Sequence, residues 1–151
     1  MGPSDVKNEV IVDEITTTRN QDLGFVTLET TITNGTSEVL SANIEVLRAS
    51  HKTDYKEWES INNEKYEFSS EEDYQYTYTD KSMEAGVGYK YRIRVWGEEA
   101  NGKIWKSANT DTDIMFFNFE DILLSDNAFQ MRIAFNPTIS NFKYTLNDTI
   151  T

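Results

Sequence analysis

Apolar and polar side chains alternate most regularly in residues 89–95 (YKYRIRV). Tyr89, Tyr91, Ile93 and Val95 share one face of this stretch, and the residues between them are basic. Successive side chains of a β-strand point to opposite faces of a sheet. The pattern therefore predicts an antiparallel strand with one face in the core and a charged outer face.

Weaker forms of the same alternation predict further short strands in residues 9–15, 25–33, 43–49, 74–79 and 103–107. No helical period is sustained in this part of the chain, which favours strands throughout. Within these strands, Val26, Leu28, Thr30 and Ile32 share one face, Ile44 and Val46 are expected to point inward, and Tyr74, Tyr76 and Tyr78 share one face.

Turn and loop signals separate the strands. Asn34-Gly35 and Asn101-Gly102 are strong turn dipeptides, residues 17–24 form a polar break, Asn62-Asn63 breaks the chain again, and residues 69–73 (SSEED) form a solvated loop. Turns recurring every ~8–12 residues between short strands are typical of an antiparallel β-sandwich. The fold class predicted is therefore all-β.

Residues 111–151 differ from the rest of the chain, because they are denser in apolar side chains and end in alternating stretches at 131–135 and 139–146. About 40 residues rarely form an independent core. We expect a C-terminal β-hairpin that begins a second, truncated domain, after a sandwich at 9–110 and a disordered or cloning-derived start at 1–8. The candidate interface residues, whose burial a lone hairpin cannot supply, are Phe116, Phe117, Phe119, Leu123 and Phe129.

The composition of the chain limits the kinds of partner that it can bind. The net charge is -12, from 14 Lys and Arg against 26 Asp and Glu, which argues against nucleic acid and against an anionic membrane surface. An acidic surface could instead dock a basic partner or a divalent cation, although a solvated face is commoner. The chain has no cysteine, hence no disulfide and no thiolate chemistry. The first ten residues lack the features of a secretion signal, and no run approaches the ~20 apolar residues of a membrane helix.

No residue pattern indicates catalysis or a cofactor. His51 is the only histidine and lies in a polar stretch, so it is expected to be a surface residue and not part of a triad. Paired carboxylates are abundant, but nothing in the sequence places them in a cleft. Asp111 and Asp113 are the nearest approach to a calcium site, yet an EF-hand loop around them is missing. We predict a protein that is not an enzyme and holds no metal.

A group of aromatic side chains suggests one ligand-binding surface. Tyr74, Tyr76, Tyr78, Trp96 and Trp105 could form a stacking platform for sugars, although cross-strand packing is the commoner role of such residues. Trp96 is the candidate exposed aromatic residue, because the alternation places it on the polar face of its strand.

Residues 43–107 resemble a fibronectin type III domain. Residues 83–87 stand where that family connects strands E and F, and Tyr89 stands at the tyrosine of the tyrosine corner. The resemblance implies an immunoglobulin-like sandwich in which Tyr89 holds this corner. Ala85 replaces the family's proline, and no tryptophan stands on the second strand, where Leu28 or Phe25 would substitute.

Two further motifs carry the same resemblance. Trp58 with Ile61 resembles the tryptophan and isoleucine of strand C′, and residues 101–103 resemble the turn into strand G. Because this sandwich hosts unrelated roles, the resemblance carries little information about function.

Residues 121–146 resemble a segment that follows fibronectin-like domains in tail-associated virion proteins of phages and prophages of Gram-positive bacteria. The resemblance implies a structural module of a phage tail or tail tip that spaces or docks other virion proteins or copies of itself. The alternative is a carbohydrate-binding or adhesive module of a bacterial surface or secreted protein, with a host surface glycan as its ligand.

Overall fold

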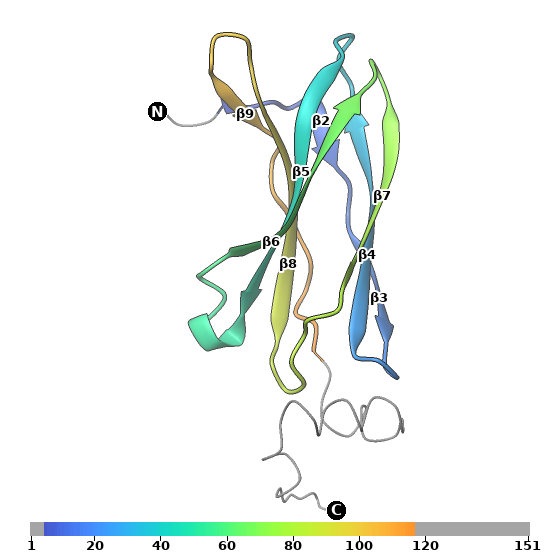
Figure 1. Cartoon of the computed structure of the whole chain (residues 1–151), viewed down its shortest axis with the longest axis vertical. Helices are drawn as coiled ribbons and strands as arrows, with labels where there is room; N and C mark the ends of the chain where they lie inside the picture. The colour runs from blue at the N-terminus through green and yellow to red at the C-terminus, as the bar shows by residue number, and fades with distance from the viewer. Residues whose placement is uncertain (1–4, 117–151) are drawn as a thin grey trace, which may run out of the picture.

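The structure, a computed structural model, describes residues 5–116, whose strands form two facing sheets (Figure 1). The predictions for residues 1–4 and 117–151 lie outside the described residues. The strands are β1 (Asp5–Val6), β2 (Val10–Val12), β3 (Thr16–Asn20), β4 (Phe25–Asn34), β5 (Leu40–Ser50), β6 (Glu59–Phe68), β7 (Asp73–Asp80), β8 (Tyr89–Glu98), β9 (Ile104–Lys106) and β10 (Thr110–Asp111), and η1 (His51–Thr53) is a 3₁₀ turn.

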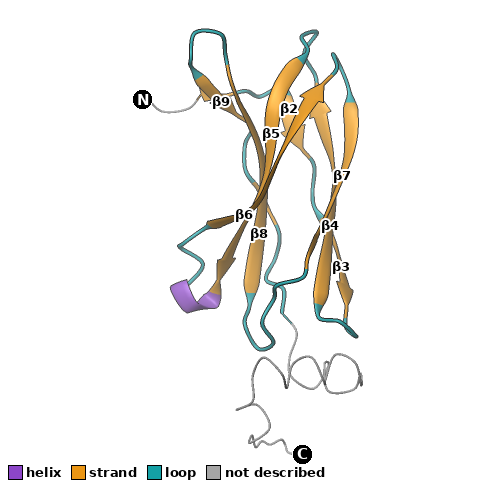
Figure 2. Ribbon diagram, viewed as in Figure 1, coloured by secondary structure: helices purple, strands orange, loops and turns teal. Residues whose placement is uncertain are grey.

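The two sheets divide the strands unequally. The larger sheet has the order β1–β9–β8–β5–β6. Strand β10 also belongs to it and pairs with β8, as β9 does. The smaller sheet pairs β2 and β3 with β4, and β4 with β7. All pairings are antiparallel except that of β1 with β9. Figure 2 shows the strands in two layers, so the all-β class is confirmed.

The core lies between the sheets and is built from the alternating positions. On β8, Tyr89, Tyr91, Ile93 and Val95 are all buried, as the alternation predicts, while the intervening basic residues are only partly exposed. The predicted faces of β4 and β5 are also confirmed. The largest fully buried side chains are Tyr76, Tyr91, Phe68, Leu28, Ile32, Ile44, Met83, Ile93, Val26 and Val46, and they come from both sheets and the loop before β8.

The polar break predicted at residues 17–24 is wrong in its first half, because β3 occupies Thr16–Asn20. This strand is mostly exposed, so it shows no apolar alternation, and its pairing with β4 holds it in place. The turn itself is only residues 21–24, where Gly24 has a φ of 71° and donates its backbone N–H to the Asn20 carbonyl at 2.9 Å.

The break predicted at Asn62-Asn63 is also wrong. The edge strand β6 runs through both residues, with a register shift opposite Val46 and Leu47. Asn62 takes part in the sandwich, because its amide donates to the hydroxyl of Tyr76 at 3.2 Å.

Asn34-Gly35 ends β4 but does not make a hairpin, because β4 and β5 belong to different sheets. The Asn34 side chain is completely buried. Its amide donates to the carbonyls of Glu38 at 2.8 Å and Ser69 at 3.0 Å, and its oxygen accepts from Thr36. The residue therefore holds the crossover between the sheets. The other dipeptide, Asn101-Gly102, does lie in the β8–β9 hairpin.

Both ends of the sandwich extend beyond the expected limits of 9 and 110. At the start, β1 pairs in parallel with β9, and the Lys7 backbone N–H donates to the Lys106 carbonyl at 2.7 Å. At the end, Met115 forms an antiparallel bridge with Tyr89. Within the described part, no helix is long and apolar enough to cross a bilayer.

Candidate functional site

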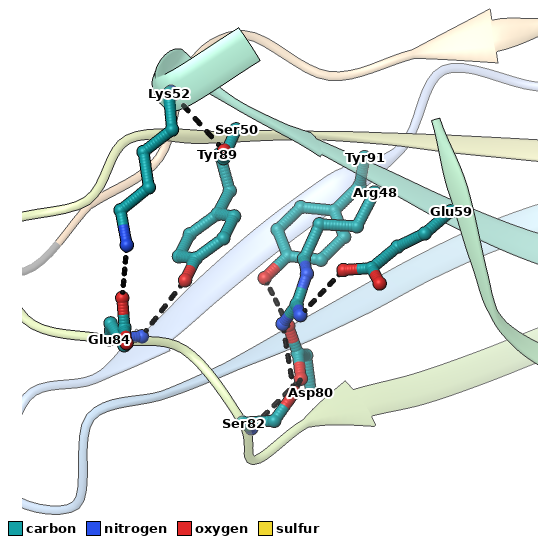
Figure 3. Close-up of polar contacts among 9 residues, drawn as sticks. All are labelled: Arg48, Ser50, Lys52, Glu59, Asp80, Ser82, Glu84, Tyr89 and Tyr91. Atoms are coloured by element: carbon teal, nitrogen blue, oxygen red, sulfur yellow. Dashed lines mark hydrogen bonds and ion pairs between the residues drawn. The ribbon is translucent and has the colours of Figure 1, made fainter. Parts of the chain in front are cut away.

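A buried charged network joins the two sheets at one end of the sandwich (Figure 3). Asp80, the last residue of β7, is only 1% exposed. Arg48 of β5 donates to Asp80 Oδ2 at 2.9 Å, and the hydroxyl of Tyr91 of β8 donates to the same oxygen. Ser82 donates to Oδ1 through its backbone N–H at 2.9 Å and its hydroxyl at 2.7 Å. The carboxylate is therefore fully surrounded by donors.

Arg48 connects this carboxylate to the surface. Its Nη2 donates to Glu59 Oε1 at 2.9 Å, and its guanidinium lies 4.7 Å from the ring centroid of Tyr89. Its Nε has no hydrogen-bond partner among the described residues. Burial would lower the pKa of Arg48, but the hydrogen bond to Glu59 and the charge of Asp80 outweigh it and raise that pKa. Arg48 therefore stays charged.

The same contacts fix the charge state of the other two members of the network. Burial alone would raise the pKa of Asp80, but hydrogen bonds from Tyr91 and Ser82 and the charge of Arg48 lower it overall. Burial and the neighbouring charge of Asp80 raise the pKa of Tyr91. At neutral pH the carboxyl group is ionised and the phenol is protonated, which suits the hydrogen bond between them.

Tyr89 and His51 hold the turn before β8. The hydroxyl of Tyr89 accepts from the backbone N–H of Glu84 at 3.1 Å. His51 is exposed, and its Nδ1 accepts from the backbone N–H of Gly88 at 3.0 Å while its own backbone N–H donates to the Gly88 carbonyl at 2.9 Å. This places both side chains in the support of one turn.

A groove of about 460 Å³ lies beside the network, but its polar groups are occupied with one another. Arg48 is paired with two carboxylates, and Lys52 bonds Glu84 at 2.9 Å. Trp58 is partly covered by the Arg92 guanidinium, 4.0 Å from its ring centroid. A ligand here would have to displace these pairs, so the groove is a poor binding site.

The outer face of the larger sheet around Trp96 is the better candidate. Two hollows, of about 560 and 240 Å³, lie on it, and Trp96 lines both. Trp96 is partly exposed, between Asn43 on β5 and Lys106 on β9 in the register of the sheet. The first hollow also includes Lys65, Glu67 and Glu98, and the second Glu45, Arg94 and Ile104.

Polar groups around Trp96 differ in how strongly they are engaged. Arg94 bonds Glu45 at 2.9 Å, and Lys65 makes only a 3.4 Å contact with Asn43. Within residues 5–116, the side chains of Lys106, Glu67 and Glu98 form no hydrogen bond or ion pair, so they can bind a ligand without breaking an existing contact. An aromatic surface with uncommitted polar groups at its rim suits a sugar ring.

Tyr66 lines the larger hollow as well, but its hydroxyl is committed. It donates to Glu72, and this hydrogen bond, with burial and the Glu72 charge, raises the pKa of Tyr66 to about 12. The ring of Tyr66 stacks on that of Tyr74, with centroids 3.9 Å apart.

The other predicted aromatic platform residues do not join Trp96. Trp105 is 4% exposed and lies in the core. The tyrosines of β7 face between the sheets: Tyr76 is buried and Tyr74 and Tyr78 are partly buried. These tyrosines pack between the two sheets, so they do not lie on the Trp96 face of the larger sheet.

The other residues that the sequence singles out, for an interface and for a metal site, do not form a common site among the described residues. Phe116 is 45% exposed, and Phe117, Phe119, Leu123 and Phe129 lie outside the described residues. Asp111 is bonded to Arg92 at 2.7 and 3.0 Å. Among residues 5–116, no three histidine or acidic side chains are grouped to hold a metal ion.

No protein-family model matches the chain, and no curated protein matches it significantly.

Sequence reasoning missed the Asp80 network. Asp80 and Ser82 stand in a polar stretch that reads as an ordinary loop, and Arg48 shares the strand parity of the inward-facing Ile44 and Val46. An arginine at an inward-facing strand position was the available signal, because a buried charge requires a partner.

Proposed function

We propose that the chain is a non-enzymatic structural and interaction module, built on a fibronectin type III-like sandwich, of a phage tail or tail tip. In this role it spaces or docks neighbouring virion proteins or copies of itself. The virion assignment rests on the sequence resemblance of residues 121–146. The docking role has a basis in the described structure.

The arrangement of the strands supports the fibronectin type III-like assignment. A small sheet built on β4 and β7 faces a larger one in which β6, β5, β8 and the split last strand follow in order. Tyr89, the first residue of β8, accepts a hydrogen bond from the backbone five residues upstream, as a tyrosine corner requires.

The observation that carries the docking role is the way the chain leaves the sandwich. Met115 and Tyr89 exchange two backbone hydrogen bonds of 2.7 and 2.8 Å. Arg19 of β3 donates to the Phe116 carbonyl at 2.9 Å. The chain is thus fixed to both sheets at this point, where Ile114 and Phe116 are 49% and 45% exposed. The apolar sequence that follows therefore begins at a point that is hydrogen-bonded to both sheets.

The virion role is tested by fractionating particles. An antibody against the purified chain should detect it in density-purified phage particles and in isolated tails, at a constant ratio to a tail protein. The docking role is tested with Phe116→Ser, compared with Val39→Ser at a distant site that is even more exposed, 60% against 45%. The first change should reduce incorporation into particles and the second should not. Recovery of the chain from the cell surface or medium, and never from particles, would refute the virion role.

The Trp96 face favours one second candidate, a carbohydrate-binding module. Its test is a glycan array probed with the whole chain and with Trp96→Ala. Signals that disappear in the variant, with an unchanged circular dichroism spectrum, would support sugar stacking on Trp96. A matched Lys56→Ala variant, at a side chain 78% exposed on the η1 loop, should bind like the parent. An array without signals for the parent chain would count against this candidate.

A further inference from the structure

One sheet edge is open along its whole length. β7 pairs with β4 in eight consecutive positions without a register shift, and it has no partner on its other side within the described residues (Figure 1). Residues 74–79 (YQYTYT) form an uncharged stretch rich in strand-forming residues. A long uncharged edge strand presents unpaired N–H and C=O groups to any strand that can approach.

The other edges carry the features that prevent such pairing. β6 contains Glu59, Glu64, Lys65 and Glu67 and lies opposite a register shift. The edge formed by β2 and β3 is divided between two short strands, and β1 has only two residues. Short, bulged or charged edges are the usual protection against edge-to-edge association. Among the described strands, β7 is the long edge without it.

We propose that β7 pairs antiparallel with β7 of a second copy of this chain, with Thr77 opposite Thr77 of that copy. The inference is independent of the virion assignment, because it depends only on the described edge. In antiparallel pairing, opposing residues must point their side chains to the same face and have the same hydrogen-bonding type. In a symmetric pair, residues of equal parity therefore oppose each other, and the centre of symmetry falls on a residue.

Charge selects the register. With Thr77 at the centre, Asp73 lies opposite Lys81 of the second copy, and the two-fold axis repeats the pair. Both side chains are exposed. Asp73 Oδ1 accepts from Thr33 at 2.7 Å, which leaves Oδ2 without a partner among residues 5–116. The neighbouring register centred on Tyr76 would set Asp73 opposite Thr79 and Lys81 opposite Glu71, which stands before β7 with a φ of 52° and so lies outside an extended strand.

The remaining contacts of this register are also compatible. On the outer face, Gln75 would lie opposite Thr79 of the second copy, and both are polar and uncharged. On the inner face, the partly buried Tyr74 and Tyr78 gain cover. Asp80 does not repel the second copy, because its charge is buried and paired with Arg48. The small sheet then continues across the axis as one sheet.

The absence of cysteine from the chain allows a direct test by cross-linking. Thr77→Cys in the full chain should form a disulfide-linked dimer under mild oxidation, because opposing Cα atoms of an antiparallel pair lie about 4.5–5.5 Å apart, a separation that a disulfide can span. Gln75→Cys is the matched control: in this register it lies about 14 Å from its own copy, four residues away along the strand. A disulfide needs Cα atoms about 4.4–6.8 Å apart, so the control should form no disulfide-linked dimer.

A charge swap tests the register independently, by sedimentation of the full chain over a concentration series. Asp73→Lys or Lys81→Asp should each weaken the dimer roughly threefold to thirtyfold, since both copies lose the pair. The double variant should restore the parent dissociation constant. Lys56→Asp changes net charge as Lys81→Asp does, at a distant loop, and should have little effect.

Three results would overturn the proposal. They are a parent chain that is monomeric at every concentration, a dimer equally sensitive to Lys56→Asp and Lys81→Asp, and equal cross-linking of the Thr77→Cys and Gln75→Cys variants. A dimer formed instead through residues 117–151 would respond to none of the β7 changes. That result would also contradict the proposal of β7 pairing.

Discussion

The hydroxyl of Tyr91 on β8 donates a hydrogen bond to the carboxylate of Asp80 on β7, so the two sheets are bonded to each other inside the core. Neither residue is more than 1% exposed. Apolar packing between sheets tolerates small sliding movements, whereas a hydrogen-bonded charge does not, because displacement leaves a buried group unpaired. The pair therefore fixes how the end of β7 lies against β8.

Removal of the buried carboxylate should strongly destabilise the fold. In Asp80→Ala, Arg48 loses its buried counter-ion and Tyr91 loses its acceptor, so we expect the free energy of unfolding to fall by about 3–5 kcal/mol. Glu59→Gln removes the charge of the other, 65% exposed partner of Arg48 and should cost less than about 1 kcal/mol. Urea unfolding of both variants measures the difference, and equal losses would show that the buried pair has no special weight.

Acid should remove the contribution of Asp80. Because its folded-state pKa is lowered, its ionisation contributes stability above the unfolded pKa of about 3.9, and this is lost as pH falls through the folded pKa. The stability difference between the parent and Asp80→Asn should therefore be constant near neutral pH and shrink below about pH 4. Unfolding curves at several pH values measure it. A difference independent of pH would contradict this assignment.

Alkaline pH should act through Tyr91. Burial and the charge of Asp80 raise its pKa, so its protonation stabilises the fold fully below the unfolded pKa of about 10 and progressively less above it. Each such tyrosine contributes a slope of about 1.4 kcal/mol per pH unit in that range. Tyr91→Phe should lose one such slope in the stability profile above pH ~10. Tyr76→Phe, whose buried phenol also has a raised pKa, should lose a similar slope while keeping the Asp80 network.

The sequence predicts best the strands that have one face in the core and the other in solvent. β4 and β8 alternate for this reason, and their buried faces are as expected. β3 escapes prediction because it is an exposed edge strand whose order comes from pairing with β4. The course of β6 is not predicted, because Asn62-Asn63 has a low strand propensity. A tertiary hydrogen bond from Asn62 to Tyr76 overrides this propensity.

The candidate site, too, is predictable from the sequence only in part. Trp96 is predictable, because strand parity alone places it on the outer face. The hollows beside it are not, since they depend on Lys65 from β6 and Lys106 from β9, which pairing brings to the same face. The Asp80 network has long-range origins too: its members come from three strands, and no local pattern links Arg48 with a residue 32 positions later.

Gly97 allows Trp105 to enter the core next to the Trp96 face, and a methyl group there should be costly. In the β8–β9 register Gly97 lies opposite Trp105, and a Cβ at Gly97 would lie 2.7 Å from Trp105 Cζ2 and 2.8 Å from the Ser41 carbonyl oxygen. Neither neighbour can move freely, because Trp105 is 4% exposed and the carbonyl belongs to β5. Gly97→Ala should therefore lower the free energy of unfolding by roughly 1–3 kcal/mol.

A double-mutant cycle separates this clash from a general effect of alanine in a strand. Trp105→Phe shortens the ring, so the cost of Gly97→Ala should be clearly smaller in that background than in the parent. Gly86→Ala is a control with no atom within 4 Å of the added methyl group, and its cost should come only from its φ of 79° and be the same in both backgrounds. If Gly97→Ala costs the same with either residue at position 105, contact with the indole does not limit this position. The Ser41 carbonyl would then account for the cost.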